Sequence, residues 1–119
     1  MDPITGLAYG RISVGALCLL SPKLAARLFL LDPKSNPQLP YLGRMFGSRE
    51  VALGLITLAA PDGDTRRRLI QLGVAVDATD AVTGVLSAAS GAVPKKTGFM
   101  LTVAGAASTA TGVLALQES

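Results

Sequence analysis

The stretch TGFMLTVAGAASTATGVLALQ, residues 97–117, contains no charged side chain. Its length is close to the roughly 20 residues that an α-helix needs to cross the hydrocarbon core of a bilayer. Taken alone, this stretch predicts a transmembrane helix.

Three more apolar segments of similar length precede it, at residues 4–20, 41–60 and 69–90. Turn-forming pieces rich in Pro, Asp and Lys separate the segments. Long parts of each segment carry no charge that could form the polar face of a soluble helix. We therefore predict an all-α fold: residues 1–119 form a single domain, a four-helix transmembrane bundle with helices at about 4–20, 41–60, 69–90 and 97–116. The absence of Trp, which is common at membrane interfaces, is the main observation against it.

A short helix is expected between the first two spans. Ser21 followed by Pro22 is typical of a helix start. Lys23 and Arg27 are four residues apart and share one face, which leaves Leu and Phe on the other. This pattern favours a short interfacial helix on the bilayer surface. The alternative is a continuation of the first span with a kink at Pro22.

Composition excludes several classes of protein. The chain of 119 residues is 50% hydrophobic and 4% aromatic, and it has no His, one Cys and a net charge of +3. Catalysis by a His base, Cys/His metal sites and internal disulfides are thereby excluded. The basic residues form no stripe interleaved with aromatics, so we expect no nucleic-acid partner. The glycines occur at helical intervals and not after a strand, so we expect no nucleotide or other cofactor.

Targeting and orientation signals are weak. Met1-Asp2-Pro3 lacks a basic region before the first apolar segment, so we expect this segment to be retained. Cys18, in an apolar run, is interpreted as a small packing residue. The basic residues between the spans divide into five on one side of the membrane and three on the other. The larger group is Lys23, Arg27, Lys34, Lys95 and Lys96, and the smaller group is Arg66, Arg67 and Arg68. Because the side with more basic residues usually faces the cytoplasm, this count favours both termini outside.

Six charged residues lie inside the apolar segments, where charges are energetically costly: Arg11, Arg44, Arg49, Glu50, Asp77 and Asp80. An unpaired charge at the centre of a bilayer costs at least about 2.5 kcal/mol. Arg11, the pair Arg49-Glu50, and the pair Asp77 and Asp80 each lie near the middle of a segment, so we expect such groups to face inward and to pair. Arg44 and Arg49 lie about 140° apart around the helix, so we expect one of them to bridge the acids and the other to reach a neighbouring helix, a lipid phosphate or a second protomer. Three Arg and three carboxylates would sum to zero.

Small and polar residues recur at steps of four and three along three of the segments, which places each set on one helix face. Each of the first two sets surrounds a carboxylate, and the third is uncharged. Such stripes let helix backbones approach closely in membranes. The sets are Gly43, Gly47, Glu50, Gly54 and Thr57; Gly73, Asp77, Asp80, Gly84 and Ser87; and Gly98, Thr102, Gly105, Thr109 and Gly112.

Several of these motifs together resemble a family of small bacterial integral membrane proteins of about four helices and no assigned activity. The resemblance covers Ile4 to about Ser90 and rests on Leu20-Ser21-Pro22 with Ala26-Arg27-Leu28-Phe29, on Leu42-Gly43-Arg44-Met45-Phe46-Gly47-Ser48-Arg49-Glu50 with Leu53-Gly54, and on Asp77 and Asp80. It implies a multi-pass protein of the bacterial inner membrane. Arg44, Arg49, Glu50 and the Asp pair look like its signature positions.

The charged residues indicate a polar site for a lipophilic small molecule. The chemistry that such a site could perform is acid/base isomerisation or cyclisation. Asp77, Asp80 and Glu50 are the candidate catalytic residues, and one of the two neighbouring Asp should keep its proton. Arg11, Arg44 and Arg49 are the candidate substrate-binding residues, since guanidinium groups stabilise negative charge. Whether the protein is an enzyme is left open.

Two other classes remain. The charges could form an internal salt-bridge network in a structural or accessory subunit of a membrane assembly, with the Gly-rich faces as docking surfaces or as contacts of a homo-oligomer. A proton-coupled carrier is the third class, but the chain lacks an inverted pair of broken helices. A metal ion at Glu50, Asp77 and Asp80 is not expected, because nearby Arg side chains already neutralise the carboxylates.

Overall fold

The computed structural model describes residues 2–32, 34–36 and 38–118, and this part of the chain contains five α-helices and no strand. The helices are α1 (Pro3–Leu20), α2 (Pro22–Leu28), α3 (Leu39–Ala59), α4 (Gly63–Ala89) and α5 (Lys95–Glu118). The predicted all-α class is therefore confirmed.

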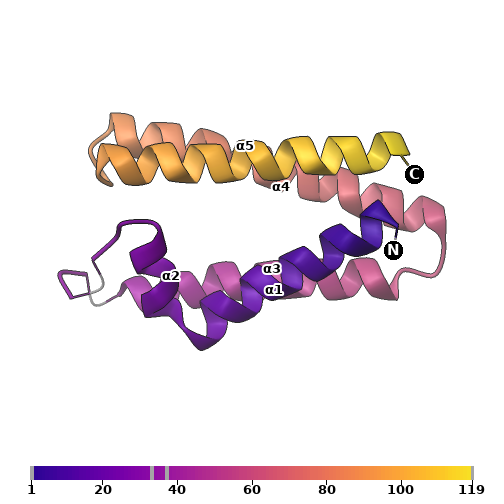
Figure 1. Ribbon diagram of the computed structural model, residues 1–119, viewed down its shortest axis with the longest axis horizontal. Coiled ribbons are helices and arrows are strands. Elements are labelled where there is room, and N and C mark those ends of the chain that lie inside the picture. Colours follow the sequence, from indigo (N-terminus) through magenta and orange to yellow (C-terminus); the bar gives the residue numbers. More distant parts are fainter. Residues whose placement is uncertain (1, 33, 37, 119) are drawn as a thin grey trace.

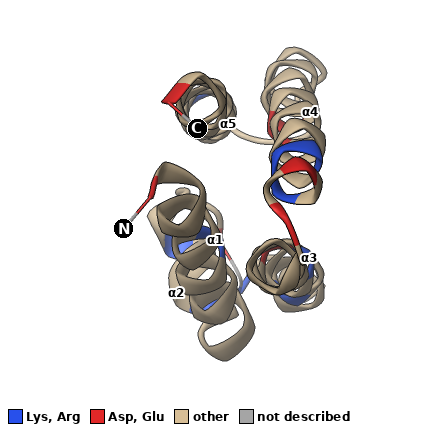
Figure 2. Cartoon of the chain, turned by 90° about the vertical axis from the view of Figure 1, so that its right-hand side faces the viewer, with Lys and Arg blue, Asp and Glu red and all other residues tan. Residues whose placement is uncertain are grey.

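The four longer helices form two antiparallel pairs. Helix α1 packs along α3, and α4 packs along α5, as Figure 1 shows. Viewed from the end, the four longer helices lie at the corners of a rough square (Figure 2). Helix α2 follows the end of α1 (Figure 1). Contacts between the two pairs are much sparser than contacts within them. Two tightly packed pairs thus face each other across a loosely packed middle.

Helix α4 begins earlier than the apolar pattern indicated, at Gly63 rather than near residue 69. The cause is Asp62, whose Oδ1 accepts a hydrogen bond of 2.6 Å from the backbone N–H of Thr65. This contact satisfies one of the free amides of the first turn. Residues 66–68, all Arg, therefore belong to the helix.

The cap at Asp62 makes the first turn of α4 sensitive to pH. Hydrogen bonding to Thr65 holds the pKa of the Asp62 carboxyl below its ordinary value. The stability that the ionised Asp62 cap adds to the first turn of α4 is complete above about pH 4 and is lost as the pH falls through the lower pKa of the folded state. We expect amide exchange at Thr65 to accelerate in acid relative to an Asp62→Asn variant, whose amide also caps but does not titrate. Equal rates in the two proteins at low pH would contradict this expectation.

A sharp bend at Ser21 separates α1 from α2, so α2 is a helix of its own and not a kinked continuation of the first span. The Ser21 side chain makes no capping hydrogen bond. The end of α2 is fixed instead by Thr97 of α5, whose fully buried hydroxyl donates to the carbonyl of Phe29 at 2.7 Å and to that of Leu30 at 3.3 Å. The loop after α2 is thereby attached to the opposite helix pair.

Close packing within each pair depends on glycines of the predicted stripes. A Cβ at Gly47 would lie 2.6 Å from the carbonyl oxygen of Gly15, and one at Gly105 would lie 2.7 Å from the backbone nitrogen of Ala81. The α5 stripe is thus a packing partner of α4, as expected. Because these faces pack inside one chain, a homo-oligomer would need other surfaces.

Apolar side chains cover much of the outer surface. Leu20, Phe99 and Leu86 are 85%, 70% and 62% exposed. Among the described residues, the buried apolar cluster between the pairs consists of Ile4, Ile70 and Ala115. Helices α1, α4 and α5 are long and apolar enough to cross a membrane. Helix α3 does not reach this standard because it contains Arg44, Arg49 and Glu50. An apolar exterior around a small apolar core is the arrangement of a membrane protein.

Candidate functional site

Arg11 of α1 joins two carboxylates from two other helices. Its Nη1 lies 2.7 Å from Oε2 of Glu50 on α3, and its Nη2 lies 2.6 Å from Oδ2 of Asp77 on α4. A further hydrogen bond of 3.2 Å runs from Nη1 to Oδ1 of Asp77, so this pair is bidentate. The three side chains are 13%, 6% and 8% exposed. Arg11 is thus the buried link between the two helix pairs.

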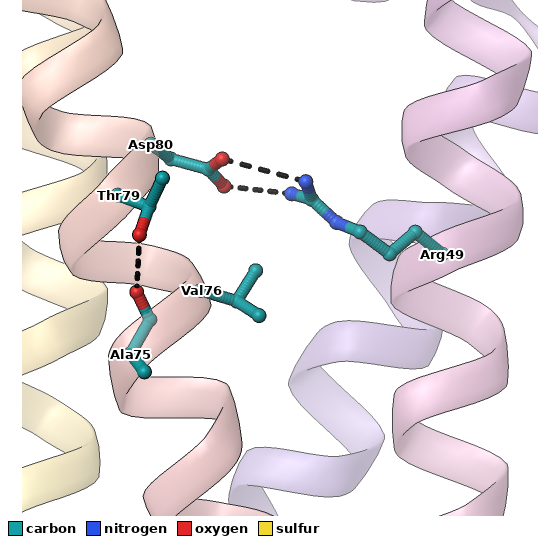
Figure 3. A pocket seen from close by; sticks show the side chains of 5 residues that line it. All are labelled: Arg49, Ala75, Val76, Thr79 and Asp80. Carbon is teal, nitrogen blue, oxygen red and sulfur yellow. Dashed lines mark hydrogen bonds and ion pairs between the residues drawn. The ribbon is translucent and has the colours of Figure 1, made fainter.

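Arg49 forms the second link. Its Nη2 lies 2.6 Å from Oδ2 of Asp80 and 3.3 Å from Oε1 of Glu50, and its Nη1 donates to Oδ1 of Asp80 at 3.4 Å. The guanidinium also lies over the ring of Phe46, 4.9 Å from the ring centre. Figure 3 shows the side chain reaching from α3 across to Asp80 on α4. These five charged residues, Arg11, Arg49, Glu50, Asp77 and Asp80, form what we call the ionic network.

The small residues of the stripes make room for this network. A Cβ at Gly73 of α4 would lie 2.6 Å from Nη2 of Arg11, so any larger residue there would displace the guanidinium. Glu50 lies between the buried Gly47 and Gly54, and Asp77 lies between the buried Gly73 and Gly84. The predicted meeting of charges from three segments is found at the centre of these stripes.

Arg44 does not join the network. Its side chain is exposed, and no ion pair to it is found among the described residues. Arg44 and Arg49 differ by about 140° around the helix, so the two could not point to one place. The expected sum of zero is therefore wrong for the network: two guanidinium groups face three carboxylates, which leaves a formal charge of −1 when all are ionised.

A cavity of about 670 Å³ lies against the ionic network, between the two helix pairs. Residues of all five helices line it, and most of them are apolar, including Leu7, Val14, Leu17 and Leu101. Four residues of the network, Arg11, Glu50, Asp77 and Asp80, belong to the same lining. The volume lies within the range of about 300–1,000 Å³ that is common for small-molecule sites.

A second, smaller hollow of about 280 Å³ lies at the contact of α3 and α4 and is lined by Arg49, Ala75, Val76, Thr79 and Asp80 (Figure 3). Asp80 lines both hollows. With its side chain 35% exposed, it is far more accessible than Glu50 or Asp77. Asp80 is therefore the carboxylate of the network that a bound molecule could reach most easily.

Glu50, Asp77 and Asp80 are also the residues that could hold a metal ion, since each offers an oxygen within 4.8 Å of the others. Arg11 and Arg49 already donate to all three carboxylates. A hard cation would have to displace these hydrogen bonds and find further oxygen ligands in an apolar surrounding. The geometry therefore fits an Arg–carboxylate network better than a metal centre.

Several site residues were not predicted from the sequence. Cys18 lines the cavity, as do the aromatic rings of Phe29 and Phe46. A signal for α1 was present, since the same steps of four and three that mark the other helices also run through it: Ile4, Ala8, Arg11, Gly15 and Cys18. Arg11 lies at the centre of this fourth stripe. No comparable pattern marks Phe29, which lies just after α2.

Comparison of the chain with protein-family models, with curated proteins and with solved structures finds no match. The resemblance to small bacterial membrane proteins therefore stays a prediction, and the functional argument rests on the site itself.

Proposed function

We propose that this chain is a multi-pass integral membrane protein that binds a lipophilic small molecule in the cavity between its two helix pairs. The observation that carries the proposal is the cavity of about 670 Å³, with apolar side chains on most of its wall and the ionic network on one part of it. A largely apolar pocket with a few convergent polar groups is the usual form of a small-molecule site.

The proposed membrane arrangement is a bundle of α1, α3, α4 and α5 with α2 at the interface. Helix α3 fails the length and apolarity standard on its own because of its charges. Glu50 and Arg49 are paired with residues of α1 and α4, and such pairing lowers the cost of placing charges in lipid. The lipid bilayer is then the main partner, and the bacterial inner membrane is proposed from the family resemblance alone.

A chemical role is proposed for the carboxylates at the cavity wall. A carboxylate that takes a proton from one atom of a bound molecule and returns it to another performs the basic step of isomerisation or cyclisation. Asp80 is the best placed for this exchange because it is the most exposed of the three acids. Arg11 lines the cavity and can stabilise negative charge that develops beside it. Arg44 lies outside this site.

The second candidate function is a non-catalytic subunit of a membrane assembly. It is favoured by the three ion pairs that join α1, α3 and α4 to one another, because a network of this kind fixes how helices dock. A purely structural network does not need an apolar cavity beside it, however. The cavity is the reason for preferring the binding function.

A bulky side chain placed in the cavity tests whether the protein binds a small molecule there. Ala104 and Ala106 of α5 are both exposed, but only Ala104 lines the cavity. We expect native mass spectrometry from mild detergent to show a retained lipophilic molecule on the native chain and on Ala106→Trp. Retention by Ala104→Trp should fall by about tenfold, because the indole would occupy space that the ligand needs and a loss of about 1.4 kcal/mol of binding free energy is tenfold in affinity. Equal retention by the two variants, or none by the native chain, would contradict binding in this cavity.

A further inference from the structure

The charge of the cavity wall indicates which ligands it can accept. Four charged residues line the cavity, of which Glu50, Asp77 and Asp80 are acidic and Arg11 is basic. Arg11 is already paired with both Glu50 and Asp77. Arg49, outside this lining, provides the only other guanidinium in contact with these acids among the described residues. With Arg49 included, the ionic network therefore lacks one positive charge when its three carboxylates are ionised.

We propose that the ligand of this cavity is a lipophilic cation, an amphiphile with one ammonium group and an apolar tail. This inference rests on the proposed binding function and specifies its ligand class. A single positive charge beside Asp80 would bring the network to neutrality. A tail would occupy the part of the cavity lined by residues such as Val14, Leu17 and Leu101.

The same lining explains why an organic cation fits better than a metal ion or an anion. An ammonium group needs few hydrogen bonds and interacts well with aromatic rings. Phe29 and Phe46 are both part of the wall, and the ring of Phe46 already packs against the guanidinium of Arg49. A metal ion would need several more oxygen ligands. An anion would face a wall that is already negative, in a medium where charges interact more strongly than in water.

The net charge of the chain allows cation binding in the cavity to be distinguished from attraction of ions to the protein surface. The whole chain carries +3, so its exterior attracts anions and repels cations. A preference for a cation would have to arise inside the cavity. Cys18 offers a natural reporter, because it is the chain's one cysteine, is buried and lines the same cavity.

The test compares three probes with alkyl chains of nine or ten carbons: decyltrimethylammonium, decanol and decanoate. The full chain is placed in phosphatidylcholine nanodiscs, and alkylation of Cys18 by N-ethylmaleimide is timed with each probe, at matched amounts bound to lipid. We expect half-maximal protection at a concentration about tenfold lower for the ammonium than for decanoate. The thermal midpoint of the protein in the same discs gives a second reading of the order of affinity.

Asp80→Asn removes the surplus negative charge, and the difference between ammonium and decanoate should then fall below about twofold. Asp64→Asn is the matched control, since it makes the same charge change at an exposed site of α4, and the tenfold preference should persist there. Equal protection by the three probes in the native chain would overturn the inference and leave the binding function standing. Protection by none of them, with no shift in thermal midpoint, would overturn both.

Discussion

Replacing Arg11 by methionine is expected to lower the free energy of unfolding by about 3 kcal/mol or more. Arg11 is the partner that Glu50 and Asp77 share, and those two carboxylates are 6% and 8% exposed. Without the guanidinium, two acids remain buried side by side, and Glu50 keeps only its longer contact of 3.3 Å with Arg49. The measurement is reversible unfolding in mixed micelles.

Two further variants separate loss of pairing from loss of side-chain volume. Combining Arg11→Met with Glu50→Gln and Asp77→Asn removes the stranded charges, so most of the lost stability should return. Arg44→Met removes a guanidinium from α3 that is exposed and outside the network. Its effect should stay within about 0.5 kcal/mol. Similar losses from Arg11→Met and Arg44→Met would show that the network does not hold the helix pairs together.

Gly15→Ala is expected to destabilise the protein by about 1–3 kcal/mol, because it forces α1 away from α3. The added Cβ would lie 2.6 Å from the carbonyl oxygen of Gly47 and 2.8 Å from the backbone nitrogen of Val51. Both are backbone atoms, so they cannot move aside as a side chain could. The variant should also loosen the contact of Arg11, one helical turn earlier, with Glu50.

Gly10→Ala on the same helix is the matched control, since nothing lies within 4 Å of a Cβ at that position. Ala is favoured over Gly inside a helix by about 0.5–1 kcal/mol, so this variant should be neutral or slightly stabilising. Unfolding in mixed micelles measures both variants. If Gly15→Ala is as stable as Gly10→Ala, the close approach of α1 and α3 is not what holds this pair together.

Much of the fold could be predicted because helix periodicity acts locally. The steps of four and three that place Gly47, Glu50 and Gly54 on one face depend only on the turn of the helix, and those residues are indeed buried together. The same argument predicted Asp77 and Gly84 on the buried face of α4. The cap at Asp62 was missed because its effect extends the helix into a segment with no apolar pattern.

The pairing of charges could be predicted only in part. That Arg and acids would meet followed from the cost of isolated charges in lipid. Which Arg meets which acid depends on how three helices pack against one another, and periodicity along one helix carries no such information. Arg44 shows the limit: it lies on the same helix as Arg49, and yet only Arg49 reaches Asp80. The surplus negative charge of the network follows from this difference.

The cavity could not be predicted from any single segment. The cavity exists because the two helices within each pair pack tightly against each other, whereas the two pairs pack loosely against one another. The attachment of Phe29 and Leu30 to Thr97 also contributes, since it places the end of α2 beside the cavity. These are contacts between residues far apart in the chain, and no local pattern marks them.

We propose that the ionic network lies at mid-depth of a bilayer, inside a membrane-spanning bundle. The most direct test of this proposal is a nitroxide label at Val82→Cys in a Cys18→Ala chain reconstituted in lipid. Val82 is 57% exposed and lies on α4 just after Asp80. The label should collide readily with oxygen and little with a water-soluble nickel chelate, whereas a label at Gly63→Cys, at the start of α4, should show the reverse. Equal access of the chelate to both positions would show that the network does not lie at mid-depth of the bilayer.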